Sequence, residues 1–449
     1  MGYGNGGMRP SLHVAAAALP LHRGMKMSAS FVPATTRGAP RMGRPRRLKF
    51  ALEAFWSGKS SARSLLDTAK AIRRSSWIEQ RNRGVSTIPS NDFSLYDHVL
   101  DTAVMVGAIP ERYGWPGGEV SLDTYFAMAK GSRSSWHTGY GSNGAHTKEA
   151  GQGVAALEMA KWFDTGYHYM VPELSEDQAF SLTSTKPVEH FHEAMALGIR
   201  TRPVVLGPVT FLKLAKPAGY AFNRMALLPK LLPVYTELLK QLRNAGVDWA
   251  QIYEPCLALD LDPTEQGAIE LAYGRMASDV PGIKIMLSTY FGEVGDNLDL
   301  ALALPVAGLH LDIVRKPEQL PPISRFPHRS LVLSLGLIDS RNIWSADMEA
   351  IVKPIVSSWP THRVQIAPSC SLLHVPINFD LKTDLDDNLH SWLALGVRKI
   401  DKLAALTKML EVNLGSTGAN SAKGAVSRRA THKMNDPLRK PTRTNPTMP

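Results

Sequence analysis

The sequence predicts an α/β fold, namely a (β/α)8 TIM-type barrel with an N-terminal helical insertion. Two observations predict it: eight short apolar runs, and helical stretches between most of them. A buried parallel strand is a short continuous apolar run, and a crossover helix must follow it. The runs are residues 30–35 (the weakest), 167–172, 204–208, 249–255, 283–291, 309–314, 330–338 and 364–370.

A third observation is that polar or reactive side chains stand in or directly after many of these runs. In this fold the chemistry lies at the carboxyl ends of the strands, so such residues are candidate functional groups. They are His168, Glu254, Thr289, Tyr290, Asp312, Asp339, Ser369 and Cys370.

The helices follow from apolar spacing. After a Gly/Pro/Arg-rich turn at 38–47, residues from Leu52 to Ile72 recur at helical spacing and predict the N-terminal insertion. A helix over 92–106 has Asp92 as its expected N-cap. Residues 225–245 predict a helix that becomes regular near Pro233 and ends at Gly246. Residues 131–153 read as a Gly-rich loop, and 389–414 as the last helix.

Charge divides the chain into three parts. Residues 1–52 contain nine Lys or Arg and no Asp or Glu. Residues 413–449 contain seven Lys or Arg and a single acidic residue, Asp436. The two ends therefore carry +9 and +6 of the net +11, which leaves −4 for residues 53–412. We predict an extension over 1–37, a barrel over 38–414 and a basic, linker-like tail over 415–449. No nucleic-acid-binding motif accompanies the tails, so we expect no nucleic-acid partner.

Residues 1–37 allow two interpretations of equal weight. They are rich in Ala, Arg, Ser and Gly without acids, as in an organelle transit peptide. They also fit an over-extended translation start, since Met8, Met25 and Met27 are available. With only two cysteines and no apolar run near 18 residues, we expect a reducing, cytoplasmic location, no membrane association, and 1–37 as a candidate targeting segment.

A dense basic cluster precedes the first helix. It contains Arg41, Arg44, Arg46, Arg47 and Lys49, and Lys161 follows further along the chain. Convergent Arg and Lys side chains suit a polyanion such as a polycarboxylate or a phosphate. The alternative is a solvated run of charges without a ligand.

Two further groups carry alternatives. Glu254 could bind a cation or substrate, act as a base, or form a buried salt bridge at the barrel mouth. Cys370 with His374, and with His168 or His310, suggests zinc. However, Cys256 follows Glu254-Pro255 and is expected to pack inward, and His310 lies within a strand. We therefore predict no metal and no cofactor in this chain, and we find no phosphate-binding Gly-rich loop.

Eight motifs resemble the N-terminal half of cobalamin-independent methionine synthase, in order, over about residues 38–414. They are 93–99 (FSLYDHV), 161–173 (KWFDTGYHYMVPE), 206–210 (LGPVT), 251–255 (QIYEP), 288–291 (STYF), 308–312 (GLHLD), 336–344 (GLIDSRNIW) and 369–374 (SCSLLH). The resemblance implies a two-barrel enzyme that transfers the methyl group of 5-methyltetrahydropteroyltriglutamate to homocysteine.

The resemblance also implies a division of labour. In the family the C-terminal barrel holds the catalytic zinc and homocysteine, and the N-terminal barrel grips the polyglutamate tail. The tail-binding stretch matches Arg46, Arg47, Leu48 and Lys49, and the lysine before Trp-Phe matches Lys161. No catalytic residue is expected in this chain, and zinc is expected only in the C-terminal barrel, which this sequence lacks.

Two departures from the family stand out: Arg47 replaces a usual Glu, and Tyr253 replaces a usual Asp. Arg47 should strengthen attraction for carboxylates. Two alternatives remain open. One is a non-catalytic polyglutamate-binding or assembly module that docks onto a separately encoded C-terminal barrel. The other is a uroporphyrinogen-decarboxylase-like enzyme that uses Glu254, Asp312 and His168.

Overall fold

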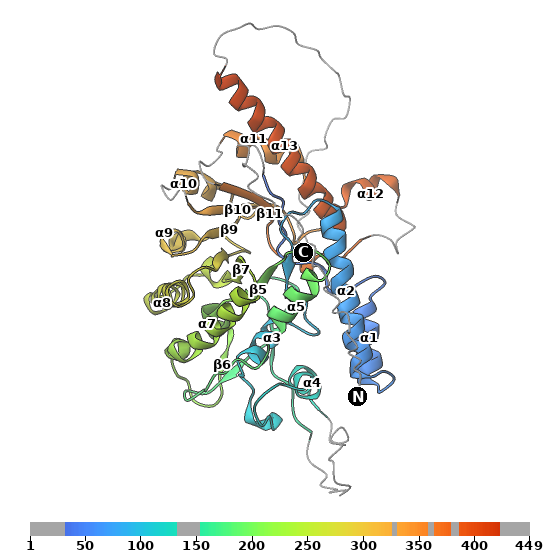
Figure 1. Ribbon diagram of the computed structural model, residues 1–449, viewed down its shortest axis with the longest axis vertical. Coiled ribbons are helices and arrows are strands. Elements are labelled where there is room, and N and C mark those ends of the chain that lie inside the picture. Colours follow the sequence, from blue (N-terminus) through green and yellow to red (C-terminus); the bar gives the residue numbers. More distant parts are fainter. Residues whose placement is uncertain (1–31, 133–152, 326–329, 358–362, 379–385, 423–449) are drawn as a thin grey trace, which may run out of the picture.

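The computed structural model describes residues 32–132, 153–325, 330–357, 363–378 and 386–422 (Figure 1). Its main sheet has seven strands in the order β1-β5-β7-β8-β9-β10-β11, and every neighbouring pair is parallel. The strands are β1 (Pro89–Ser90), β5 (Arg202–Leu206), β7 (Trp249–Tyr253), β8 (Lys284–Ser288), β9 (Gly308–Asp312), β10 (Val332–Ile338) and β11 (Arg363–Pro368).

The segment 33–36 occupies the eighth place and closes the sheet into a barrel. On one side, the Thr35 amide donates to the carbonyl of Ile366 in β11 (2.8 Å). On the other side, the Thr36 amide donates to the carbonyl of Thr87, next to β1 (3.2 Å). The predicted barrel is therefore confirmed, and the weak run at 30–35 overlaps its first segment.

One predicted strand was wrong. The run at 167–172 contains β3 (His168–Met170), which pairs antiparallel with β2 (Met159–Lys161) outside the barrel. The second barrel strand is instead the two-residue β1, which is too short to give an apolar run. His168 is consequently not at the end of a barrel strand. A further small sheet joins β4 (Glu173–Leu174) to β6 (Lys216–Pro217).

Helices follow most barrel strands and cover the sheet. Figure 1 shows α7, α8, α9 and α10 along one outer side, with α1 and α2 on the opposite side. The helices are α1 (Arg47–Trp56), α2 (Ala62–Asn82), α3 (His98–Met105), α4 (Leu122–Lys130), α5 (Lys186–Met195), α6 (Pro208–Leu214), α7 (Leu228–Asn244), α8 (Pro263–Asp279), α9 (Leu298–Ala303), α10 (Leu320–Arg325), α11 (Met348–Ser357), α12 (Asp387–Trp392) and α13 (Gly396–Ala422).

The predicted N-terminal insertion is present as α1 and α2, but other helix boundaries differ. Helix α3 is capped by Asp97, whose Oδ1 accepts from the amides of Val99 and Leu100, and not by Asp92. Helix α7 is regular from Leu228 onward, with Pro233 inside it. The expected last helix is divided, because a non-helical stretch separates α12 from α13.

The structure also bears on the predicted boundaries between the N-terminal extension, the barrel and the tail. Residues 32–37 belong to the barrel, since Val32, Ala34 and Arg37 are buried there. Residues 1–31 lie outside the described chain, as do 423–449 and most of the predicted loop at 131–153. Helix α13 extends to Ala422, so the first residues of the predicted tail over 415–449 are helical. Within the described residues, no helix is both long and apolar enough to cross a bilayer.

Candidate functional site at the barrel mouth

A cavity of about 60 Å³ lies at the carboxyl ends of the barrel strands. Its lining includes Asn91 after β1, Leu206 at the end of β5, Tyr253 at the end of β7 and Tyr290 after β8. This is the edge where barrel enzymes assemble their active sites. The cavity is therefore the candidate functional site of the barrel itself.

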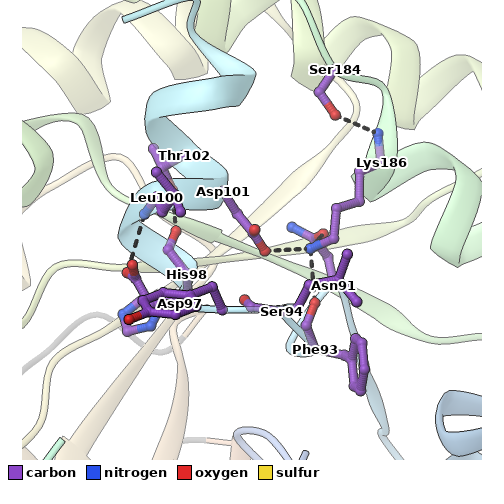
Figure 2. A network of polar contacts seen from close by, with 12 residues as sticks. Asn91, Phe93, Ser94, Asp97, His98, Leu100, Asp101, Thr102, Ser184 and Lys186 are labelled. Carbon is purple, nitrogen blue, oxygen red and sulfur yellow. Dashed lines mark hydrogen bonds and ion pairs between the residues drawn. The ribbon is translucent and has the colours of Figure 1, made fainter. Parts of the chain in front are cut away.

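One wall of the cavity is a charged network between α3 and α5 (Figure 2). Lys186 Nζ donates to Asp101 Oδ2 (2.7 Å), to Asn91 Oδ1 (3.0 Å) and to the carbonyl of Phe93 (2.8 Å). The hydroxyl of Tyr125 donates to the other oxygen of Asp101 (2.7 Å). All three ammonium protons of Lys186 are thus engaged, which fixes the wall.

Aromatic rings form a second wall. The ring of His98 stacks on Tyr167 (centroids 5.7 Å apart) and meets Trp162 edge-on (4.3 Å), while Tyr167 meets His374 edge-on (6.0 Å). Burial lowers the pKa of His98 to about 3 and that of His374 to about 4. Both imidazoles are therefore neutral at physiological pH, and each offers one donor and one acceptor.

The turn of the β2–β3 hairpin, residues 162–167, is held at the barrel mouth by ion pairs and an aromatic contact. Asp164 Oδ1 lies 2.9 Å from Arg341 Nη1, and Asp164 Oδ2 lies 2.9 Å from Arg315 Nη2. Phe163 contacts Phe291 with ring centroids 5.7 Å apart, and both residues have positive φ. Non-glycine residues in that region are strained and persist where surrounding contacts impose them.

Below the mouth, the interior of the barrel holds a fully buried arginine. Arg37 Nη1 donates to Gln251 Oε1 (2.5 Å) and Ser288 Oγ (2.9 Å), and Nη2 donates to Ser334 Oγ (2.6 Å). Burial lowers its pKa to about 10, so the guanidinium remains charged at neutral pH. His310, also predicted as a possible zinc ligand, is in hydrogen-bond contact with Ser334 Oγ (3.1 Å) inside the same barrel.

Glu254 is fully buried but does not line the cavity. Its carboxylate accepts from the amides of Val209 (3.2 Å) and Thr210 (2.8 Å) and from Thr210 Oγ1 (2.5 Å), at the start of α6. Burial raises its pKa to about 7. Among the described residues Glu254 forms no salt bridge; its carboxylate instead accepts hydrogen bonds from the first turn of α6.

Two other predicted strand-end groups have similar local roles. Asp312 accepts from the amides of Phe291 (3.3 Å) and Arg315 (3.1 Å), and Asp339 accepts from that of Arg341 (2.8 Å). Among the eight predicted residues, Tyr290 alone lines the cavity. None of the three residues of the decarboxylase-like alternative lines the cavity: Glu254 and Asp312 accept hydrogen bonds from backbone amides, and His168 is exposed on the hairpin.

The residues proposed for zinc are not gathered either. Cys370 is buried, with Sγ 3.6 Å from the Ser371 carbonyl, and Cys256 packs beside Glu254. In the described ranges, no three His, Cys, Asp or Glu side chains are grouped as metal ligands.

The predicted tail-binding residues lie on two elements. Arg46, Arg47 and Lys49 are exposed together at the start of α1, while Lys161 is exposed at the end of β2. Leu48 is fully buried between them in a core shared with Phe93 and Met170. It therefore anchors the turn and offers no polar contact.

Arg41 is separated from its neighbours in the basic cluster because its side chain lines the mouth cavity. Sequence reasoning did not select Lys186, Asp101 or His98, because they lie on helices and not at barrel strand ends. The motif at 93–99 nevertheless contains His98.

Comparison with known proteins identifies the family. The family model described as "Cobalamin-independent synthase, N-terminal domain" matches residues 33–358. The chain belongs to the cobalamin-independent methionine synthase family. Two proteins named 5-methyltetrahydropteroyltriglutamate–homocysteine methyltransferase are similar to it. That of Mesorhizobium japonicum is 58% identical over 409 residues (90% of this chain, 53% of the relative), and that of Caulobacter vibrioides is 52% identical over 412 residues (90% and 53%).

The chain thus spans about half the length of the curated methionine synthase relatives it matches. The barrel is also similar to a B12-independent methionine synthase from Shewanella sp. W3-18-1, solved in complex with selenomethionine. That likeness has a TM-score of 0.56 and 14% identity, and it covers 86% of this chain and 99% of the other. At that identity it supports the fold alone.

Proposed function

We propose that this chain is the N-terminal half of a cobalamin-independent methionine synthase and binds the polyglutamate tail of 5-methyltetrahydropteroyltriglutamate. In this proposal the methyl group is transferred to homocysteine in the C-terminal half, which supplies the zinc. Family membership and the names of the relatives support the reaction. The surface at the start of α1 supports the tail-binding role.

The observation that carries the proposal is the charge at the start of α1. Arg46, Arg47 and Lys49 are exposed around its first turn, and this fully described helix has no acid there. The amino end of a helix carries a partial positive charge and unpaired amides. Cationic side chains at that end are therefore in an unfavourable electrostatic environment. Bound carboxylates would relieve this repulsion and accept hydrogen bonds from the same groups.

The ion pair of Lys49 with Glu53 does not prevent that role. Lys49 Nζ lies 3.7 Å from Glu53, and both side chains are about half exposed (50% and 52%). An exposed pair one helical turn apart contributes little and exchanges readily for a ligand. Lys161, on the ribbon that leads into Trp162, supplies a further exposed cation for a flexible chain of carboxylates.

The test compares triglutamate and monoglutamate forms of 5-methyltetrahydrofolate by calorimetry. For Lys49→Ala/Lys161→Ala we expect triglutamate affinity to fall by about tenfold or more while monoglutamate affinity changes less than about twofold. Lys70→Ala/Lys353→Ala, which removes two exposed lysines elsewhere, is the matched control. Equal losses for both folates would contradict the assignment.

A second assay tests whether methyl transfer requires the C-terminal half. The chain with added zinc should form no methionine from homocysteine and the triglutamate. Addition of the C-terminal half of the Mesorhizobium japonicum relative should allow turnover. Turnover by the chain alone would show that the reaction does not need the second half.

A further inference from the structure

Arg41 has hydrogen-bonding capacity at the mouth cavity that its protein contacts do not use. Its Nη1 donates to the carbonyl oxygens of Ser94 (3.2 Å) and Leu95 (3.1 Å). A guanidinium has five N–H groups, and within the described chain no acceptor bonds to Nε or Nη2. That edge of a guanidinium matches a carboxylate with two parallel hydrogen bonds.

Acceptors with spare capacity line the same cavity. Asp101 accepts one hydrogen bond at each oxygen, from Tyr125 and Lys186, and Asp92 Oδ2 accepts one from the Ala39 amide (2.9 Å). A carboxylate has about four acceptor positions, so both side chains retain some. The Tyr167 hydroxyl is buried with no partner in the described chain. An ammonium group could be held by these carboxylates.

Part of the remaining lining is apolar, although Ser94, His98 and His374 add polar groups. Met105, the β5 residues Val204 and Val205, and Leu373 form one part, and the rings of Trp162, Tyr253 and Tyr290 form another. The other cations of the lining are already engaged, Lys186 by three acceptors and Arg37 by the barrel interior. An uncharged, apolar side chain would be favoured there because it leaves no unpaired charge buried.

The volume of the cavity limits the size of the ligand. A cavity of about 60 Å³ holds roughly four to six water molecules at about 10–15 Å³ each, which matches a small molecule. We propose that the mouth cavity binds a free α-amino acid with an uncharged, apolar side chain. Arg41 pairs with its carboxylate, and Asp101 and Asp92 accept from its ammonium. This site is distinct from the tail-binding surface and does not depend on the proposed function.

The first test uses the unmodified chain and calorimetry with L-methionine, L-leucine, glycine and N-acetyl-L-methionine. We expect the two apolar amino acids to bind with a Kd below about 1 mM, and glycine at least about tenfold more weakly because it buries no side chain. N-acetylation removes the ammonium charge and should abolish binding. No binding of any amino acid, or equal binding of the N-acetyl form, would overturn the proposal.

Variants then locate the site. Arg41→Met and Asp101→Asn should each weaken L-methionine binding at least tenfold, whereas Arg63→Met, at an exposed position of α2, should leave it unchanged. Thermal unfolding verifies that each variant is folded. Lys49→Ala/Lys161→Ala should retain amino-acid binding, so failure of the tail-binding proposal is distinguishable from failure of this one. Unchanged affinity in both folded cavity variants would place the ligand elsewhere.

Discussion

Asp164 and Arg341 are separated by 177 positions in the sequence, yet their carboxylate and guanidinium groups are 2.9 Å apart. Arg341 also donates to the main-chain carbonyl of Asp164 (2.8 Å), and Arg315 binds the same carboxylate. One acid therefore joins the β2–β3 hairpin to the loops after β9 and β10. The hairpin carries both Trp162 of the cavity and Lys161 of the proposed tail-binding surface.

Asp164→Ala should loosen the hairpin with little effect on the whole barrel. Because the Asp164 side chain is 62% exposed, we expect the free energy of unfolding to fall by about 1 kcal/mol or less. Hydrogen exchange at residues 162–167 should nevertheless accelerate. Asp279→Ala, which removes the partner of Arg275 on α8, is the control. Unchanged exchange at 162–167 would show that the aromatic contacts alone hold the hairpin.

Glu254→Gln should change how stability depends on pH. The pKa of Glu254 is about 7 in the folded chain and near 4.5 when exposed. Between these values the folded state binds the extra proton, so this group's contribution to stability falls as pH rises from about 4.5 to 7.

Glutamine cannot ionise, so the variant should gain stability relative to the parent, by up to about 3 kcal/mol, between pH 5 and pH 8. Denaturant unfolding at the two pH values measures the difference. A constant difference between variant and parent would contradict the raised pKa.

Arg47→Glu tests the departure from the family pattern. It places an acid beside Arg46 and Lys49, so the triglutamate should bind about tenfold more weakly at low salt. The effect should shrink at high ionic strength, because exposed charges are screened. Arg275→Glu, an equal change of charge on α8, should have a smaller effect. An unaltered affinity would remove Arg47 from the tail-binding surface.

Leu48→Ala tests whether Leu48 stabilises the fold without contacting the triglutamate. Leu48 is fully buried, so truncation should lower the free energy of unfolding by about 2–5 kcal/mol. In the fraction that remains folded, triglutamate affinity should change little, because no polar group is lost. A large loss of affinity at full folding would show that the turn at 46–49 depends on this contact for its shape.

The sequence predicted those parts of the fold that continuous apolar runs encode. Strands β5 and β7–β11 correspond to six of the eight predicted runs. The run at 167–172 was wrongly predicted as a barrel strand. It belongs to an antiparallel ribbon that packs on an aromatic cluster, and such a ribbon is as apolar as a barrel strand. Strand β1 was missed because two residues held mainly by neighbouring backbone leave no pattern.

The site was less predictable for a different physical reason. Polar residues after a strand can bind a ligand or bind the backbone of the next loop, as Glu254 and Asp312 do, and sequence does not distinguish the two. Arg41 and Arg46 are five positions apart in one basic cluster, yet only the first lines the cavity. Only the three-dimensional path of the chain separates such neighbours.

The segment 33–37 limits how the amino terminus could be shortened. Removal of Arg37 would take away the donor that Gln251 Oε1, Ser288 Oγ and Ser334 Oγ share inside the barrel. Loss of Thr35 would remove the backbone hydrogen bond that joins this segment to Ile366 of β11. Initiation at Met8, Met25 or Met27 keeps that segment intact. A protease that matures the chain must therefore cut ahead of Pro33 to leave the barrel closed.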